Sequence, residues 1–347
     1  MKVNFLKTYK MKHFKILTSN KAKNLVQKRE GETKFFEDVS FGNSKKSIEN
    51  QLEKSSAKFV LFGISEDIGV RANFGKPGTK NAWNSVLKTL LNIQSNRFTK
   101  ANQLLILGHF DFDKIDFKKS DDNIEKKLRK KVTIIDKEVT HLVHLIKKNG
   151  KIPIAIGGGH NNAYGMIKGC ALGLKSKLNA INFDAHTDLR GLEGRHSGNG
   201  FSYALEEGFL ERYFVFGVHE NYTSESIYNR IENTKNIAYI SFESIGVRKE
   251  ISFKKALEKG QDFVSKQPFG VEVDCDAIAH CPSSAMTPTG FDSTKARQFV
   301  FGLGNHSNAT YLHICEAAPK LYPKKKGFNV GKMITALIVD FVTSKSE

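Results

Sequence analysis

The chain has 347 residues, of which 39% are hydrophobic and 26% are charged, and its formal net charge is +18. This composition excludes an intrinsically disordered chain, and without any run of 18 apolar residues we expect no membrane-spanning helix and no membrane partner. The positive charge is spread along the chain and is mostly Lys, so it favours a solvated basic surface over a nucleic-acid site.

Four cysteines, at positions 170, 275, 281 and 315, show no CxxC spacing. Residues 1–20 are basic and lack the apolar core of a secretory signal. Both features predict a protein of the reducing cytoplasm.

Residues 1–52 are rich in Lys and contain no clear motif, so we expect a basic N-terminal accessory region followed by one domain over residues 53–347. From residue 58 onward, apolar runs alternate with helical patterns. The predicted strands span residues 58–63, 104–107, 152–156, 178–183, 213–218, 238–242, 269–273 and 311–315. The predicted helices span residues 81–93, 122–148, 162–174, 251–266, 291–303 and 330–344. Strands separated by helices predict a three-layer α/β/α fold with a central, mainly parallel sheet.

Three of the predicted strands end at residues that bind metal ions in proteins. His160 follows the strand 152–156 after three glycines, which allow a sharp turn. Asp184 follows the strand 178–183, and Asp274 follows the strand 269–273. Since the carboxyl ends of parallel strands meet at one edge of the sheet, we expect these side chains to converge.

The spacing within two segments adds further ligands. Asp184, His186 and Asp188 alternate along the chain, as do Asp274 and Asp276, so each set can share one face of an extended segment. Taken alone, an Asp at a strand end is commonly a helix cap, and a Gly-rich turn needs no metal. Together, two histidines and four carboxylates exceed the needs of one tetrahedral zinc ion and favour two manganese or magnesium ions, which activate water for hydrolysis.

These segments resemble the ureohydrolases, the family of arginase, agmatinase and formimidoylglutamase. The matching pieces are Gly157–His160, Asp184–Asp188, Asp274–Asp276 and Glu316, within a region that runs from about residue 59 to residue 341. The resemblance implies an arginase-like fold for residues 53–347, two Mn²⁺ ions per subunit, and a homotrimer or homohexamer. One ion would be held by His160, Asp184, Asp188 and Asp274, and the other by His186, Asp184, Asp274 and Asp276. As catalytic residues, Asp188 would accept a hydrogen bond from the activated water and Glu316 would pair with the cationic nitrogens of the substrate.

The resemblance leaves the substrate to the segment that follows Asp188. Arg190 is similar to the Arg of formimidoylglutamase-like members and would bind a substrate carboxylate, although a salt-bridged surface Arg is the alternative. Ser197 and Asn199 match the substrate loop of arginases and are candidates for substrate binding. His196 precedes this pair, whereas the proton-shuttle histidine of arginases follows it, so His196 is either a catalytic residue or a loop histidine.

The predicted function is hydrolysis of a linear amidine, with N-formimidoyl-L-glutamate preferred and L-glutamate and formamide as products, as in histidine degradation. The alternatives are an arginase- or agmatinase-type guanidino hydrolase that releases urea, and a non-catalytic binding protein with the same fold. A two-metal phosphoesterase is disfavoured because no glycine loop is placed to hold a phosphate.

Overall fold

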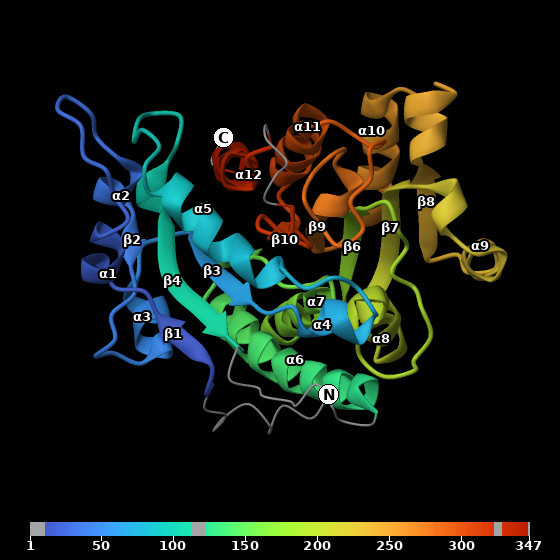
Figure 1. Ribbon diagram of the computed structural model, residues 1–347, viewed down its shortest axis with the longest axis horizontal. Helices are drawn as coiled ribbons and strands as arrows, with labels where there is room; N and C mark the ends of the chain where they lie inside the picture. The colour runs from blue at the N-terminus through green and yellow to red at the C-terminus, as the bar shows by residue number, and fades with distance from the viewer. Residues whose placement is uncertain (1–10, 113–122, 323–327, 346–347) are drawn as a thin grey trace.

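The computed structural model describes residues 11–112, 123–322 and 328–345, and these residues build one large sheet between two layers of helices (Figure 1). The strands are β1 (Phe14–Ile16), β2 (Ser40–Phe41), β3 (Phe59–Ser65), β4 (Leu104–Asp111), β5 (Ile152–Ile156), β6 (Leu178–Phe183), β7 (Leu210–Val218), β8 (Ile237–Ser241), β9 (Phe269–Asp274) and β10 (Ala309–Cys315). Their order is β1-β4-β3-β5-β10-β9-β6-β7-β8, and β2 pairs with β4 beside this path.

Every pairing between named strands is parallel except that of β1 with β4. The central strands β5, β6, β9 and β10 are buried along their whole length, which explains why their sequences are mostly apolar and do not alternate with exposed polar residues. The predicted three-layer fold with a mainly parallel sheet is confirmed.

Helices cover both faces of the sheet. The helices are α1 (Ser19–Lys23), α2 (Phe35–Asp38), α3 (Ile48–Lys54), α4 (Ile68–Ala72), α5 (Ala82–Leu90), α6 (Ile124–Lys148), α7 (Asn162–Leu174), α8 (Gly200–Glu206), α9 (Glu225–Glu232), α10 (Phe253–Val264), α11 (Ser293–Gly304) and α12 (Val330–Ser344). Figure 1 shows α5, α12, α11 and α10 on one side of the sheet, and α6, α7 and α8 on the other. Among the described residues, no helix combines the length and apolar character needed to cross a bilayer.

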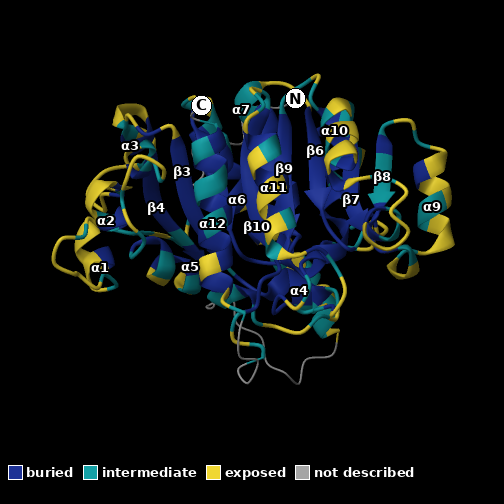
Figure 2. Cartoon of the chain, turned by 90° about the horizontal axis from the view of Figure 1, so that it is seen from above, coloured by how far each residue is buried: buried dark blue, intermediate teal, exposed yellow. Residues whose placement is uncertain are grey.

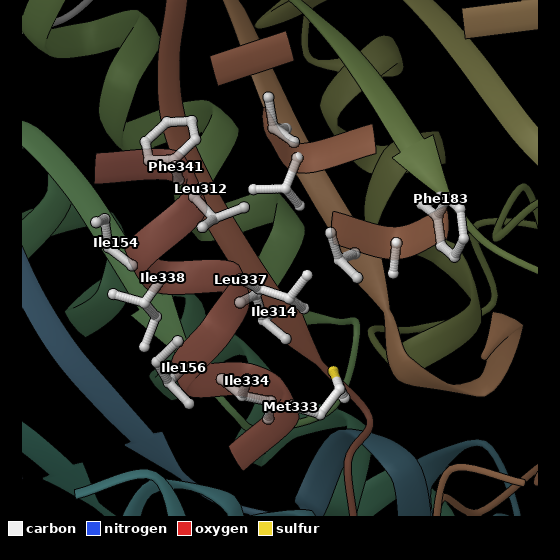
Figure 3. Packing of buried hydrophobic residues seen from close by; sticks show 14 of the residues in the cluster. Ile154, Ile156, Phe183, Leu312, Ile314, Met333, Ile334, Leu337, Ile338 and Phe341 are labelled. Atoms are coloured by element: carbon white, nitrogen blue, oxygen red, sulfur yellow. The ribbon is translucent and has the colours of Figure 1, made fainter. Parts of the chain in front are cut away.

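The core under α12 shows how one face of the sheet is closed. Ile334, Leu337, Ile338 and Phe341 are buried and lie against Ile154 and Ile156 of β5 and Leu312 and Ile314 of β10 (Figure 3). Burying side chains of this size contributes about 1.5–3 kcal/mol each before entropy is counted. This packing holds β5 and β10 side by side, and these strands carry His160 and Glu316 beyond their carboxyl ends.

The predicted strands and long helices are all present, with shifted ends. The predicted helix 81–93 ends at Leu90, and β4 runs on to Asp111. The start predicted near Asp122 lies outside the described residues. The short helices α4, α8 and α9 were not predicted.

The N-terminal region contributes β1 and β2 to the edge of the same sheet, where both pair with β4. Its buried residues Ala22, Phe35 and Val39 belong to the core that lies under α5. A domain boundary at residue 52 stays a prediction.

Candidate metal centre

The six predicted metal ligands lie together beyond the carboxyl ends of β5, β6 and β9. Figure 2 shows the arrowheads of β6, β7 and β8 pointing toward the side of the molecule where α4 lies. His160 comes from the turn after β5, Asp184, His186 and Asp188 come from the segment after β6, and Asp274 ends β9. The parallel sheet therefore brings together residues that are more than a hundred positions apart in the chain.

The first group of ligands surrounds the ring of His160. Nδ1 of His160 lies 2.8 Å from a carboxylate oxygen of Asp188, 3.1 Å from one of Asp274 and 3.2 Å from one of Asp184. Nδ1 nevertheless has no hydrogen bond of acceptable geometry among the described residues. Three acceptors around one ring nitrogen are the arrangement of ligands that share an ion, and these four residues have the spacing of a metal site.

The second group shares Asp184 with the first. Nδ1 of His186 lies 3.1 Å from Asp276 and 3.6 Å from Asp184, and these three residues again have the spacing of a metal site. Asp274, predicted to belong to both groups, meets that spacing in the first only. Backbone amides orient two of these carboxylates, since Asp184 accepts from the N–H of His186 at 2.7 Å and Asp274 from the N–H of Asp276 at 2.8 Å.

The carboxylates of the centre lie so close together that they favour the binding of cations. Burial raises the pKa of Asp274, and the neighbouring carboxylates of Asp276 and Asp184 raise it further. Burial and the charge of Asp184 likewise raise the pKa of Asp188. Carboxylates this close cannot all ionise unless positive charge lies between them. Two divalent ions with oxygen and imidazole ligands fit this donor set, and its carboxylates favour manganese over zinc.

Two functional side chains sit on a left-handed backbone. Asp188 has φ of 50° and Glu316 has φ of 60°, which lie in a region that non-glycine residues rarely adopt. Oε1 of Glu316 accepts the backbone N–H of His160 at 2.9 Å, which fixes the carboxylate beside the first metal group. Burial raises the pKa of Glu316 to about 8.

The glycine turn before His160 is held by Glu66, which the sequence analysis missed. Oε1 of Glu66 accepts the N–H of Gly159 at 2.8 Å and the side chain of Asn162 at 2.7 Å. Gly158 has φ of +72°, and a Cβ there would lie 2.7 Å from Glu66. Glu66 directly follows β3, so its position at a strand end, the feature that identified Asp184, could have revealed it.

A pocket of about 480 Å³ opens above the ligands. It is lined by His186, Asp188, Asp274, Asp276 and Glu316 below, and by Asn73, Arg190, Ser197, Tyr222 and Ser284 toward the solvent. Arg190 donates to Oδ1 of Asn73 at 2.7 Å and to Glu193 at 3.0 Å, and about half of its side chain is exposed. The structure therefore places Arg190 and Ser197, two of the predicted substrate-binding residues, at the mouth of the pocket above the metal centre.

Arg190 and Ser197 belong to one loop, and two other predicted residues of that loop, His196 and Asn199, do not line the pocket. Nδ1 of His196 accepts the N–H of Gly198 at 3.1 Å, and burial lowers the pKa of this fully buried histidine to about 4. Asn199 uses its side chain to hold the loop, accepting from Arg195 at 2.6 Å and donating to the carbonyl of Gly194 at 2.9 Å. Their predicted roles in catalysis and substrate binding stay predictions.

A buried ion pair anchors the same loop. The guanidinium of Arg195 donates to Asp136 of α6 at 2.9 Å and to the carbonyl of Asn161 at 2.9 Å. It lies between the rings of Tyr164 and Tyr203, 4.8 and 4.9 Å from their centroids. The loop that carries Arg190 and Ser197 is thus tied to the residue that follows His160.

Comparison with known proteins agrees with this geometry. The model of the Arginase family matches residues 57–340. A formimidoylglutamase from Geobacillus kaustophilus is 28% identical over 282 residues, which cover 79% of this chain and 81% of that protein.

Two solved structures share the fold. The formiminoglutamase of Trypanosoma cruzi, solved with Mn²⁺, has a TM-score of 0.70 at 18% identity and covers 90% of this chain and 98% of its own. The formimidoylglutamase of Bacillus subtilis has a TM-score of 0.71 at 18% identity and covers 92% of this chain and 94% of its own. The fold is therefore arginase-like, as expected.

Proposed function

Because the chain belongs to the arginase family, with residues 57–340 matching the family model, we propose that it is a manganese-dependent hydrolase of linear amidines. The observation that carries this proposal is the pair of ligand groups that share Asp184 under a pocket lined by Glu316. The preferred substrate is N-formimidoyl-L-glutamate, the substrate named by relatives such as the Geobacillus kaustophilus protein. Water adds to the formimidoyl carbon, the bond to the glutamate nitrogen breaks, and L-glutamate and formamide leave.

The residues that would hold the two ions are the six at the strand ends. His160, Asp188 and Asp274 would serve the first ion, His186 and Asp276 the second, and Asp184 both. When bound, the manganese ions supply Lewis acidity that makes a water molecule nucleophilic at neutral pH. Among the alternatives considered, a non-catalytic protein has no need of this complete ligand set.

The side chains around the ions would orient the substrate and move its protons. Glu316 lines the pocket and would accept hydrogen bonds from the planar amidinium, whose geometry matches a carboxylate. Asp188 also lines the pocket beside the first metal group, where its carboxylate would accept a hydrogen bond from the attacking water and take up its proton. The same carboxyl would return that proton to the departing glutamate nitrogen, which leaves as an amine.

Arg190 would select the acidic end of the substrate. It is the single Arg or Lys among the described residues that line the pocket, and a guanidinium can bind a carboxylate through two parallel hydrogen bonds. Its present partners, Asn73 and Glu193, hold it at the mouth, where a substrate carboxylate would replace Glu193. Ser197 lines the same side and would donate a further hydrogen bond.

The test is a substrate panel with manganese-loaded protein. We expect formamide from N-formimidoyl-L-glutamate, and little urea from arginine, agmatine or guanidinobutyrate. Urea from arginine or agmatine at the higher kcat/KM would replace this proposal with a guanidino hydrolase. Full manganese loading with no turnover of any of the four would contradict the enzymatic role.

We further propose that the protein acts in the cytoplasm as a homotrimer or homohexamer without a nucleic-acid partner. Its four cysteines are free and buried, which suits a reducing compartment, and family membership supports the assembly. Light scattering coupled to size exclusion measures the assembly state, and a monomer would contradict it.

A further inference from the structure

A second polar cluster lies behind His160, on the side of its ring that faces away from the aspartates. It consists of Glu272 on β9 and of Tyr311 and His313 on β10, and all three side chains are completely buried. Glu272 and His313 are direct neighbours in the parallel ladder between these strands. The cluster therefore lies inside the sheet, beneath the metal centre and out of reach of the substrate.

The carboxylate of Glu272 is held on both oxygens. Its Oε1 accepts the hydroxyl of Tyr311 at 2.6 Å, and its Oε2 lies 2.6 Å from Nδ1 of His313. A carboxylate accepts and does not donate, so Nδ1 of His313 carries the hydrogen. The same Oε2 lies 3.6 Å from Nε2 of His160, just beyond hydrogen-bond length.

A charge at this place needs a partner of opposite sign. Glu272 stands between Val271 and Val273 in a strand without exposed residues, where an uncompensated carboxylate would destabilise the fold. The hydroxyl of Tyr311 and the ring of His313 each donate one hydrogen bond to it. A metal ion at Nδ1 of His160 would add positive charge across the same imidazole ring, on the side that faces Asp188.

We propose that Glu272 is a positioning residue for the metal ligand His160. The charge of Glu272, 3.6 Å from Nε2, favours the hydrogen at that nitrogen and so keeps the lone pair of Nδ1 directed at the ion, and the same charge makes the ring a stronger ligand. Tyr311 and His313 fix the carboxylate in place. The inference rests on the proposed function only in requiring that manganese binds.

The two metal groups differ in this support. His160 is fully buried with Glu272 behind it, whereas His186 is one-third exposed and its ring stacks on Tyr222 with 5.4 Å between centroids. Within the described part of the chain, Nε2 of His186 has no carboxylate behind it. Loss of the Glu272 charge should therefore weaken the ion at His160 and spare the ion at His186.

The test is a titration of metal-free protein with manganese. Calorimetry measures the affinity of each equivalent, and electron paramagnetic resonance distinguishes free from spin-coupled Mn²⁺. We expect two equivalents for the unaltered chain. For Glu272→Gln, one equivalent should bind about 10–100-fold more weakly while the other is unchanged, and the spin-coupled signal should give way to that of a single ion. Tyr311→Phe, which removes a hydrogen bond and keeps the charge, should retain both equivalents. Glu272→Met removes the same charge and serves if the Gln variant does not fold.

A double-mutant cycle separates this role from a general loss of structure. His160→Asn should weaken the same equivalent, and adding Glu272→Gln to it should cause no further loss, because Glu272 acts through the ring. Two unchanged equivalents in Glu272→Gln, equal weakening of both, or additive losses in the cycle would overturn the inference. Substrate does not enter these measurements, so a failed substrate panel with two bound ions would overturn the proposed function and leave this inference standing.

Discussion

The floor and the mouth of the pocket are built in different ways. The floor consists of side chains at the ends of β5, β6, β9 and β10, most of them buried, and backbone N–H groups fix Asp184, Asp274 and Glu316 among them. The mouth consists of loop residues such as Arg190, which is half exposed and held by Asn73 and Glu193. The sheet thus determines the chemistry, while the loop determines which substrate reaches it, and each should respond to mutation without the other.

The largest effect is expected from Asp184→Asn, because Asp184 belongs to both metal groups. Losing both ions removes several kcal/mol of transition-state stabilisation, so kcat/KM should fall by at least about three orders of magnitude. Elemental analysis should show less than one manganese per chain. Asp262→Asn, at an exposed site on α10, is the matched control and should bind two. A fully loaded Asp184→Asn variant would show that the floor does not depend on this carboxylate.

Arg195→Met should destabilise the protein by removing the ion pair that anchors the loop at the mouth of the pocket. It leaves Asp136 buried and unpaired beneath the loop, which typically costs about 3–5 kcal/mol of unfolding free energy. Arg297→Met breaks an exposed ion pair with Asp340 of similar geometry and should cost less than about 1 kcal/mol. Denaturant unfolding measures both. Equal losses would mean that the loop anchor contributes no more than a surface pair.

Arg190→Ala should affect substrate binding and spare the floor. Removing a charge-assisted hydrogen-bond pair costs about 1.5–3 kcal/mol, so KM for N-formimidoyl-L-glutamate should rise about 10–100-fold with two manganese ions still bound. Arg190→Lys keeps the charge and loses the fork, and should recover only part of the loss. Unchanged kinetics in Arg190→Ala would contradict the proposed role of Arg190 in selecting the substrate.

Manganese affinity should rise with pH. Burial lowers the pKa of His186, but Asp276 and Asp184 outweigh burial and raise it well above the ordinary value. His160 behaves alike, with Cys315 and the aspartates around it raising its pKa against burial. Both rings therefore hold a proton in the metal-free protein near neutral pH, and the ion must displace it. Affinity should grow by up to about tenfold per pH unit for each proton released. Calorimetry in two buffers of different ionisation enthalpy counts these protons, and a count of zero would contradict the expectation.

The floor was predictable from the sequence because two sequence patterns mark it. Apolar runs located the ends of the strands, and the alternation of Asp184, His186 and Asp188 placed three ligands on one segment. Even Glu272 leaves a trace, as a charge placed between Val271 and Val273 inside a buried strand. What the pattern cannot give is its partner, since Tyr311 and His313 meet Glu272 only through the order of β9 and β10 in the sheet.

The mouth was less predictable because loop residues follow no regular pattern along the sequence. The sequence placed Arg190 and Ser197 near the substrate, and the structure puts both in the pocket lining. It offered no means to see that His196 and Asn199 turn inward, because that depends on Arg195 reaching Asp136 across 59 positions of the chain. Short helices such as α8 and α9 escaped for a related reason, since two turns carry too little periodicity to be recognised.

The left-handed backbone at Asp188 and Glu316 means that this fold and its chemistry favour different residues. Each position costs about 1–2 kcal/mol of local strain with an ordinary side chain, and glycine would relieve it. In the metal-free protein, removing either carboxylate would also reduce repulsion among its neighbours. A screen of variants for thermal stability alone, in the presence of a chelator, would therefore enrich glycine at these two positions and recover stable, inactive proteins. The residues that such a screen discards first would outline the active site without any substrate being supplied.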